Sequence, residues 1–574
     1  MTGAPPGGRD VAPVYRDDPR LAGLIGPGAP FEVEAVQVGG VWVRDFVRAP
    51  RAIGELFPMG EAHEERVNVV YGDERWTYAE MRRRQRSLAR ELASTFRVRP
   101  GDRVAIAMRN LPEFAVAFWG AALVGAVAVP MNSWWAGPEL GYALADAGVS
   151  VLIADGECLT RVLGAGRPDG VPLVGVRSDL GDVAFDDLTT GAPIDAGEVV
   201  DLGRDDPVTL MYTSGTTGRP KGAVITNRAM IASLWNMAFA TIREATISGR
   251  PSGPPRQSAS ISTGPLFHIG GISAIVAAPM SGSKMVLVHK WDLDEVLRLA
   301  VDEEVTGLGG VPAVARQILG DPRLPALGLD VRTFPMGGGP VPPDLPGRVI
   351  AVLGSGVQAL NGYGSTETTS AVVTNVGVEL EARPDAVGRP NLTADVMVVD
   401  ADGRALGTGE VGELCVRSPQ VVAGYWNDEA ATAASFRGGW FHTGDLGSVD
   451  DEGFVRVVDR LKDVVIRGGE NVYCVEVEAV LHEHPAVAEV AVLGLAEPVM
   501  GERVCAVVVP RAGAGVRLTD LRAHVATRLA AFKCPEALWV TDELPRNATG
   551  KVAKPTLRAR LATADDVGDV ERAW

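Results

Sequence analysis

The stretch MYTSGTTGRPKGAVITN, residues 211–227, decides the fold and gives the first functional hypothesis. Glycines and hydroxyl side chains follow an apolar strand here: Thr213, Ser214, Gly215, Thr216, Thr217 and Gly218. Glycines let the backbone turn its N–H groups inward and hydroxyls add donors, so such a loop can surround phosphate oxygens. Lys221 adds positive charge. The segment therefore predicts a phosphate-binding loop, with an exposed surface loop as the alternative.

The loop differs from the P-loop of nucleotide triphosphatases. That motif requires Gly-Lys followed by Ser or Thr, so that the lysine and the hydroxyl reach the phosphates and Mg²⁺. Here Lys221 follows Pro220 and precedes Gly222. We therefore exclude a P-loop enzyme and look for another nucleotide-binding class.

The surrounding pattern predicts an α/β fold. Buried-strand candidates at 102–108, 127–130 and 149–155 alternate with a helix at 113–125, and 66–97 has the pattern of two strands and a helix. This alternation is typical of a large domain of parallel-rich sheets layered with helices. Beyond residue 460 the pattern predicts a small α+β domain, with helices at 475–482 and 518–530 and strands at 489–495 and 503–509.

Length divides the chain further, because 574 residues exceed what one hydrophobic core serves. We expect an N-terminal extension, partly disordered, over residues 1–60, a large domain over 61–460 and a C-terminal domain over 461–574. A Ser/Gly/Pro-rich stretch at 247–260 is predicted to be an exposed loop.

Composition narrows the class of function. The net charge of −17 argues against nucleic acid or an anionic membrane as partner. The five cysteines are scattered, and no signal peptide precedes residue 30, so we expect a cytoplasmic protein. The apolar run 114–129 is short for a membrane span and is interpreted as a buried helix running into a buried strand. Whether the chain forms a homodimer is left open.

Further motifs follow in order: PLFHIGG (265–271), PMGGGP (335–340), NGYGSTETT (361–369), GWFHTGDLG (439–447), DRLKDVVIRGGENV (459–472) and PRNATGKVAK (545–554). Together with the first loop they resemble the adenylate-forming enzymes, which include the acyl-CoA synthetases, peptide-synthetase adenylation domains and firefly luciferase. The resemblance extends over about residues 60–560. It implies that the small domain is mobile, and that the substrates are a fatty or aryl acid, ATP with Mg²⁺, and coenzyme A.

The resemblance also assigns the nucleotide contacts. Tyr363 would pack on the adenine, Thr366 would touch the α-phosphate, and Glu367 would hold Mg²⁺. Asp445 would bind the ribose hydroxyls, and Arg460 would contact the ribose or a phosphate. The rest of the nucleotide set is the first loop with Lys221, the glycine segment Gly338, Gly339 and Pro340, and the residues Asn361, Gly362 and Gly364.

Two half-reactions are implied by the resemblance. Lys551 would reach the α-phosphate and the substrate carboxylate during adenylation. The small domain would then rotate about Lys462 and present Gly468, Gly469 and Glu470 to the CoA thiol tunnel. The acyl pocket would use His268 beside the carboxylate, with Trp235, Phe267, Gly271 and Gly337 as neighbours. The segment after the phosphate loop has no aspartate placed to hold an α-amino group.

Three alternatives stay open at this point. The same chemistry could load a carrier protein or join an amine, although the 23 residues after Lys551 contain no carrier motif. A luciferase-like oxygenase shares the motifs and differs only in its pocket. A nucleotide-binding regulator without catalysis would have lost Lys551 or Glu367, and both are present.

Overall fold

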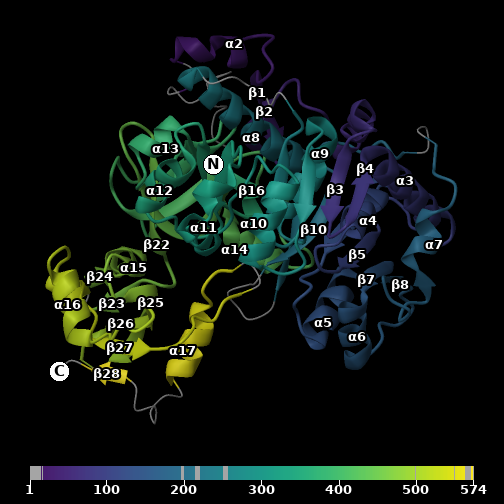
Figure 1. The fold of residues 1–574 in the computed structure, drawn as a ribbon. Coiled ribbons are helices and arrows are strands. Elements are labelled where there is room, and N and C mark those ends of the chain that lie inside the picture. The colour runs from purple at the N-terminus through teal and green to yellow at the C-terminus, as the bar shows by residue number, and fades with distance from the viewer. Residues whose placement is uncertain are drawn as a thin grey trace. The chain divides into compact units, whose positions relative to one another are not determined.

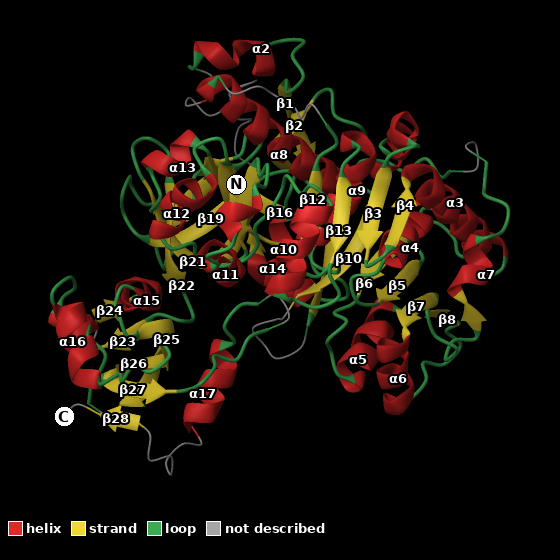
Figure 2. Ribbon diagram, viewed as in Figure 1, coloured by secondary structure: helices red, strands yellow, loops and turns green. Residues whose placement is uncertain are grey.

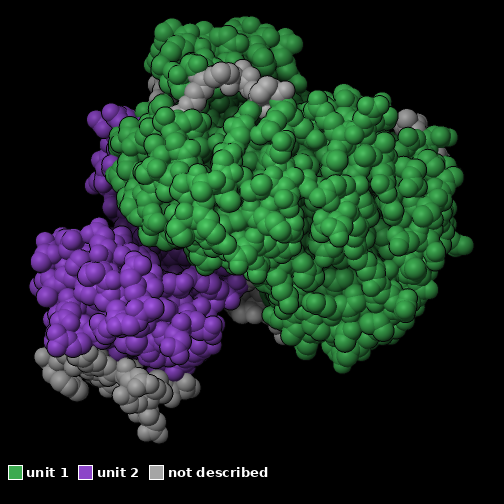
Figure 3. Space-filling view, viewed as in Figure 1, with its two compact units in different colours: residues 1–395, 416–441 green, residues 396–415, 442–574 purple. Residues whose placement is uncertain are grey.

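The computed structural model describes residues 15, 17–195, 199–213, 220–249, 256–468, 470–497, 499–547, 550–562 and 570–572. The chain divides into two compact units, shown in different colours in Figure 3. Unit 1 comprises residues 1–395 and 416–441, and unit 2 comprises residues 396–415 and 442–574. Each unit is described by itself. The predicted domain limits at residues 60 and 460 divide the chain by function and mobility. They stay predictions.

The strand before the phosphate loop lies in a sheet of unit 1 with the order β11-β10-β6-β5-β7-β8-β9 (Figure 1). Neighbouring strands are parallel except β10 and β11, which are antiparallel. Aliphatic runs fill the inner strands, as is typical of strands covered on both faces. The strands are β5 (Arg103–Ala107), β6 (Val127–Pro130), β7 (Val151–Asp155), β8 (Leu173–Val176), β9 (Val183–Ala184), β10 (Pro207–Thr213) and β11 (Lys221–Thr226).

Helices connect these strands as the sequence predicts. The helix between β5 and β6 is buried along its whole length, and β6 follows it as a buried strand, which confirms the interpretation of the apolar run 114–129. Within the described residues, no helix is both long and apolar enough to cross a membrane. The helices are α3 (Tyr78–Ser94), α4 (Pro112–Leu123), α5 (Gly137–Ala147), α6 (Gly156–Ala165) and α7 (Phe185–Thr189).

Two further sheets of unit 1 have the orders β12-β13-β3-β4 and β14-β15-β16-β17. Parallel bridges from Gly307 to Ser260 and to Thr333 link them, and one hydrophobic core that includes Val286 and Phe334 packs beneath both. The strands are β3 (Val67–Tyr71), β4 (Glu74–Thr77), β12 (Ala259–Ser262), β13 (Lys284–Leu287), β14 (Thr333–Gly337), β15 (Gln358–Ser365), β16 (Ser370–Val376) and β17 (Arg389–Pro390).

Helices on these sheets carry segments of the candidate site (Figure 2). They are α8 (Asn227–Ser248), α9 (Ile269–Ser281), α10 (Leu293–Asp302), α11 (Pro312–Gly320), α12 (Asp344–Leu353), α13 (Val378–Ala382) and α14 (Glu429–Ser435); α14 leads into the short strand β20 (Phe436–Arg437). The Thr226 hydroxyl accepts a hydrogen bond from the Ala229 N–H and so caps α8. The predicted loop 247–260 is shorter than expected, since α8 continues to Ser248 and β12 begins at Ala259; residues 250–255 lie outside the described residues.

The N-terminal extension belongs to unit 1. After α2 (Ala22–Ile25), β1 (Val33–Val38) and β2 (Val41–Phe46) form an antiparallel hairpin. Its turn residues Gly39 and Gly40 both have positive φ, as a type I′ hairpin turn requires. Buried Asp45 pairs with Arg204 at 2.9 Å and with Arg228 of α8, so the hairpin is tied to the helix that follows the phosphate loop.

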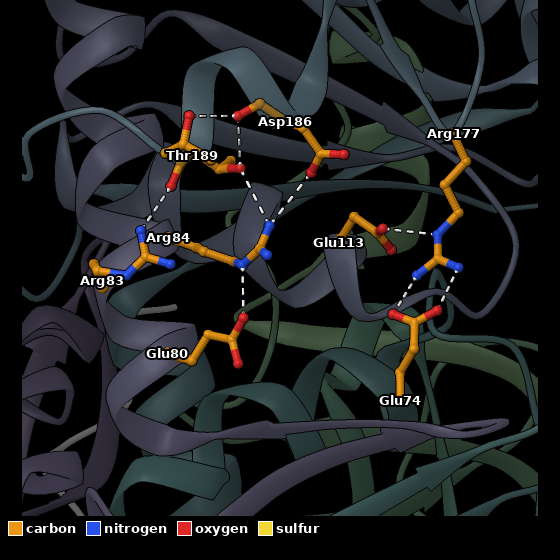
Figure 4. A network of polar contacts seen from close by, with 9 residues as sticks. Glu74, Glu80, Arg83, Arg84, Glu113, Arg177, Asp186 and Thr189 are labelled. Atoms are coloured by element: carbon orange, nitrogen blue, oxygen red, sulfur yellow. Dashed lines mark hydrogen bonds and ion pairs between the residues drawn. The ribbon is translucent and has the colours of Figure 1, made fainter.

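Figure 4 shows two groups of polar contacts, one around Arg177 and one around Arg84. Arg177, which follows β8, donates to Glu113 at 2.7 Å and to Glu74 at 2.7 Å. Burial raises the pKa of Glu113, and the guanidinium of Arg177 opposes that rise. On the neighbouring helix α3, Arg84 pairs with Glu80 at 3.2 Å. Arg177 therefore links α4 to β4, and the Arg84–Glu80 pair lies within α3.

Unit 2 holds two sheets. One is formed by β18 (Asp395–Val399), β19 (Gly412–Arg417), β21 (Trp440–Val449) and β22 (Val455–Arg460). Most residues of these strands belong to unit 2. The other has the order β24-β23-β26-β27-β28, with β25 beside β26. Its strands are β23 (Val465–Arg467), β24 (Glu470–Val472), β25 (Val487–Glu497), β26 (Gly501–Pro510), β27 (Ala537–Val540) and β28 (Val570–Arg572).

Three helices complete unit 2: among its described residues these are α15 (Cys474–His482), α16 (Leu518–Ala526) and α17 (Lys554–Ala562). The α+β pattern predicted beyond residue 460 is confirmed. The helix predicted at 518–530 is too long, because α16 ends at Ala526. There the Thr527 hydroxyl donates to the His524 carbonyl at 2.7 Å, which satisfies one of the carbonyl groups left open at a helix end.

Candidate active site

The phosphate loop leaves and re-enters the first sheet as a hairpin. Its flanking residues Thr213 and Lys221 are partners in the β10–β11 pair, and the Thr213 hydroxyl donates to the Lys221 carbonyl at 3.4 Å. The ends of the loop are therefore held together, as a phosphate cradle requires. The predicted phosphate contacts Ser214, Gly215, Thr216, Thr217 and Gly218 lie outside the described residues, and their role stays a prediction.

The predicted metal-binding carboxylate, Glu367, lies in the short turn Thr366–Thr368 that follows β15. The hydroxyl of Tyr425 donates to Oε1 of Glu367 at 3.1 Å. Nζ of Lys221 lies 5.2 Å from the centre of the same tyrosine ring. The structure therefore brings the lysine of the first loop and the carboxylate of the second onto one aromatic side chain.

The protonation of Tyr425 follows from this position. Burial raises the pKa of its hydroxyl, and the negative charge of Glu367 raises that pKa further. The tyrosine therefore keeps its proton at neutral pH and acts as a donor to the carboxylate. A carboxylate oriented by a neutral hydroxyl keeps its negative charge available for a cation.

The glycine segment predicted to line the adenine slot lies beside the second nucleotide motif. Strand β14 is parallel to β15, with Met336 opposite Asn361 and Gly337 opposite Gly362. Gly338 follows at a φ of +74°, which favours glycine. Gly339 and Pro340 come next, and Tyr363 is half-buried on β15. The two motifs predicted to face the adenine are thus on adjacent strands.

Glycine is also required on β15 itself. A Cβ on Gly364 would lie 2.0 Å from the Ser370 carbonyl oxygen, which is far closer than any real contact. Strands β15 and β16 approach each other closely just where the Thr366–Thr368 turn begins. The glycine in NGYGSTETT therefore sets the position of the turn.

The predicted acyl-pocket residues lie on elements that pack together. Helices α8 and α9 contact each other, and both contact β16. Trp235 is half-buried on α8, while Phe267, His268 and Gly271 lie just before or in the first turn of α9. A Cβ on Gly271 would meet the Leu266 backbone at 2.5 Å, so the turn before α9 is tight.

One aromatic residue near these elements was not predicted. Trp134 is 46% exposed, and its ring contacts Phe267 edge to face with centroids 6.2 Å apart. The guanidinium of Arg109 lies 5.4 Å from the Trp134 ring centre. An exposed Trp in the sequence WW would have been a signal, because tryptophan is enriched at binding surfaces.

In unit 2 the predicted ribose contacts form a pair. Asp445 and Arg460 are partners across β21 and β22, and their side chains lie 3.1 Å apart. Glu413 accepts hydrogen bonds from the Gly444 N–H at 3.1 Å and from Nδ1 of His442 at 2.8 Å. Glu413 therefore fixes the backbone immediately before Asp445, a role that the sequence did not reveal.

The loop that carries Lys551 is closed by hydrogen bonds. The Lys551 N–H donates to Oδ1 of Asn547 at 3.0 Å, and the Lys551 carbonyl accepts from the Asn547 N–H at 2.8 Å. Lys554, at the start of α17, pairs with half-buried Glu478 at 2.9 Å. Burial alone would lower the pKa of Lys554, but Glu478, with smaller contributions from Cys474 and Asp459, raises it overall. This second lysine is therefore a structural anchor.

The predicted hinge and tunnel residues are mostly exposed. Lys462 is exposed. Its pKa is lowered mainly by partial desolvation and further by repulsion from Arg460. Gly468 has a φ of +60°, and a Cβ there would lie 2.5 Å from Cε of Met500. Glu470 is exposed on β24, and Gly469 lies outside the described residues.

The chain belongs to the AMP-binding enzyme family. The model of the AMP-binding enzyme matches residues 59–426, and that of the AMP-binding enzyme C-terminal domain matches residues 476–551. The first of these covers more than half of the chain and includes every motif of unit 1 described above. The resemblance drawn from the sequence is confirmed.

Curated relatives are CoA ligases. The chain is 37% identical over 498 residues to a feruloyl-CoA synthase of an Amycolatopsis species, covering 86% of this chain and 95% of that one. It is 35% identical over 493 residues to the long-chain-fatty-acid–CoA ligase FadD13 of Mycobacterium tuberculosis, covering 85% and 94%. The class of enzyme is therefore the AMP-forming acid–thiol ligase.

Solved structures agree in fold. The o-succinylbenzoate CoA synthetase of Bacillus subtilis, in complex with its acyl-adenylate intermediate, is 31% identical with a TM-score of 0.76, covering 92% of this chain and 100% of that one. The same enzyme in complex with ATP and a magnesium ion has a TM-score of 0.73 at 31% identity, covering 88% and 98%. The predicted α/β fold class, with a large N-terminal and a small C-terminal domain, is confirmed.

A substitution at Gly364 tests the close approach of β15 and β16. In Gly364→Ala the added methyl must push the strands apart, and overpacking typically costs about 1–3 kcal/mol, which corresponds to about 5- to 150-fold in an equilibrium constant. We expect ATP to bind at least about fivefold more weakly in titration calorimetry. In the control Gly356→Ala the new Cβ meets nothing within 4 Å, and its affinity should be that of the wild type. A folded Gly364→Ala with wild-type affinity would contradict this assignment.

Proposed function

We propose that the enzyme activates a fatty or aryl carboxylic acid with ATP, releases pyrophosphate, and transfers the acyl group from acyl-AMP to coenzyme A. The observation that carries the proposal is that Lys221 lies over the ring of Tyr425 and Glu367 accepts a hydrogen bond from the hydroxyl of the same tyrosine. These contacts bring the two predicted phosphate-facing motifs together. The CoA ligases among the relatives and the acyl-adenylate complex of the related synthetase support it.

In the first half-reaction a carboxylate oxygen attacks the α-phosphorus of ATP. A new O–P bond forms, the bond to the β-phosphate breaks, and pyrophosphate leaves. The obstacle is electrostatic, because an anion must approach a polyanion. We assign Lys551 to offset this repulsion, and Thr366 and the 213–218 loop donors to hold the phosphate oxygens. Fixed donors of this kind are worth about 3 kcal/mol each.

The residues present fit a magnesium ion. Glu367 offers a half-buried carboxylate, and the Tyr425 hydroxyl engages one of its oxygens, Oε1. Hard divalent cations favour carboxylate oxygens and usually retain waters and phosphate oxygens as further ligands. Glu367 would hold the ion, which neutralises phosphate charge when bound. The related synthetase structure with ATP and magnesium supports this assignment.

Several side chains hold the nucleoside in this proposal. Tyr363 packs on the adenine, and Asn361, Gly362 and the glycine segment of residues 337–340 line the slot. The Asp445 carboxylate accepts hydrogen bonds from the two ribose hydroxyls, which a carboxylate can do with its two oxygens. Arg460 pairs with that carboxylate at 3.1 Å and adds a contact to the ribose or a phosphate.

In the second half-reaction the CoA sulfur attacks the acyl carbon, the C–S bond forms, and AMP leaves with the electrons of the C–O bond. We propose that unit 2 rotates about Lys462, which withdraws Lys551 and presents the 467–472 segment. Gly468 leaves room for a narrow thiol channel because it has no side chain. Such domain movements let one site serve two reactions.

The acid is held in an apolar pocket in this proposal. His268 borders the carboxylate, and Trp235, Phe267, Gly271 and Gly337 shape the remainder. The set mixes large aromatic and small residues, which suits an aryl or otherwise apolar acid. The substrates ATP and CoA, together with five buried cysteines, favour a cytoplasmic location.

Removing the ammonium of Lys551 should separate the two half-reactions. In Lys551→Ala we expect acyl-AMP formation to fall by about 100-fold or more, because a fixed charge that stabilises the transition state is lost. Thioester formation from supplied acyl-AMP should be retained. The assay uses the acid that releases most pyrophosphate in a panel graded in length and aromaticity. Lys290→Ala, an exposed lysine, is the control. Equal loss of both half-reactions would refute the proposed rotation of unit 2 between them.

Stiffening the hinge should have the reverse effect. Proline fixes φ near −65° and restricts the residue before it, so Lys462→Pro should hinder rotation. We expect pyrophosphate release in a single turnover to continue while thioester formation falls by about tenfold or more. Lys462→Ala removes the same charge without fixing φ, and it should keep more thioester activity. Equal thioester rates in the two variants would speak against the hinge.

A further inference from the structure

Residues 418–426, here named the 418–426 segment, contact both phosphate-facing motifs of unit 1. Its backbone pairs with β11: the Trp426 N–H donates to the Gly222 carbonyl at 2.7 Å, and the Ala423 N–H donates to the Val224 carbonyl at 2.9 Å. The same segment reaches the other motif, because the Val422 N–H donates to the Glu367 carbonyl at 3.0 Å. It therefore fixes the spacing between the exit of the phosphate loop and the Glu367 turn.

The Glu367 turn has a backbone that needs external support. Thr369 and Ser370, which follow it directly, have φ values of +47° and +81°. Residues other than glycine seldom adopt this region, and they persist there only when surrounding contacts hold them. Thr369 is fully buried, so the support must come from the protein interior.

Gln420 supplies that support. Its fully buried side-chain amide donates to the Thr368 carbonyl at 3.3 Å and to the Ala371 carbonyl at 3.1 Å, on either side of the two positive-φ residues. Its backbone carbonyl accepts from the Thr369 hydroxyl at 2.7 Å. One residue thus binds the turn before, within and after its strained part.

The Gln420 amide is itself held in place. Its Oε1 accepts from Nδ2 of Asn236 at 2.7 Å, and Asn236 is fully buried on α8. Nδ2 of Asn236 also lies 2.6 Å from the Thr393 hydroxyl. Because both ends of the amide are engaged, its orientation is fixed, and a buried network in which every member is satisfied gives a single arrangement.

We propose that Gln420 and Tyr425 are positioning residues for Mg²⁺·ATP: Gln420 holds the backbone of the Glu367 turn, and Tyr425 orients the Glu367 carboxylate. Neither residue need touch the nucleotide. The inference rests on the proposed role of Glu367 in holding the metal. It adds that the 418–426 segment determines where that carboxylate is presented.

Hydrogen exchange of the protein without nucleotide tests the role of Gln420 directly. In Gln420→Leu, which keeps the volume but loses the amide, we expect the backbone amides of residues 366–371 to exchange at least about tenfold faster. The control Gln85→Leu removes another buried glutamine, whose amide donates to the Ala115 carbonyl, and should leave this segment unchanged. Unchanged exchange at 366–371 in a folded Gln420→Leu would overturn the role of Gln420.

Tyr425→Phe removes only a hydroxyl. It tests the proposal even if Gln420→Leu fails to fold. We expect the Mg²⁺ concentration for half-maximal ATP binding to rise about tenfold, while kcat at saturating Mg²⁺ changes far less. Tyr78→Phe, which loses a buried hydroxyl bonded to the Ala278 carbonyl, should show neither effect. An unchanged Mg²⁺ requirement in Tyr425→Phe, or a loss of kcat alone, would overturn the role of Tyr425.

The two proposals fail in different ways. A wild-type enzyme that binds ATP without any effect of Mg²⁺ would contradict the role of Glu367 in the proposed function. The exchange experiment needs neither ATP nor Mg²⁺, so it still decides whether Gln420 holds the turn. A Gln420→Leu variant with faster exchange but a wild-type Mg²⁺ requirement would limit Gln420 to the fold and overturn its link to the metal.

Discussion

The hydrogen bond from the Tyr425 hydroxyl to the Glu367 carboxylate joins the parts of unit 1 on which the chemistry depends. A carboxylate that must serve a cation close to a polyanion cannot be free to turn, since its charge is useful in only one direction. The tyrosine orients it, and Lys221 lies over the same ring. Phosphate-facing groups far apart in the sequence thereby acquire one geometry.

Close packing of backbone is the second constraint. Gly364 lies against the Ser370 carbonyl, and Gly337 lies opposite Gly362, so the strands that present the adenine slot approach without side chains between them. The cost of this arrangement is a turn with two positive-φ residues, Thr369 and Ser370. A buried glutamine from a distant segment compensates that cost. The strained backbone at the Glu367 turn is therefore matched by the buried polar network behind it.

Sequence patterns predicted what is local. Strand β6 and helix α4 follow from runs of buried residues, and the phosphate hairpin follows from the glycines and hydroxyls after β10. The resemblance of the motifs to those of the adenylate-forming enzymes identified the enzyme class, with Glu367, Asp445 and Lys551 in family order. Boundaries were less accurate: α16 ends at Ala526, where a threonine hydroxyl satisfies a helix carbonyl, and propensity does not report such a bond.

Long-range partners were beyond the sequence. Gln420 lies 49 and 52 positions from the carbonyl groups that it binds, and no spacing rule connects residues at such distances. Glu413 likewise acts on Gly444 across two strands. Gln420 is polar and fully buried, which is uncommon, but its burial becomes visible only once the strands are placed. The identity of the substrate acid could not be predicted either, because it depends on how α8 and α9, which carry the proposed acyl-pocket residues, approach each other.

Transfer of oxygen from the acid tests the central claim most directly. When the carboxylate is labelled with ¹⁸O and the enzyme turns over with ATP, Mg²⁺ and CoA, attack on the α-phosphorus must leave one carboxylate oxygen in AMP. The account predicts labelled AMP and unlabelled pyrophosphate by mass spectrometry. Unlabelled AMP, or label in the pyrophosphate, would contradict an acyl-adenylate formed at this site.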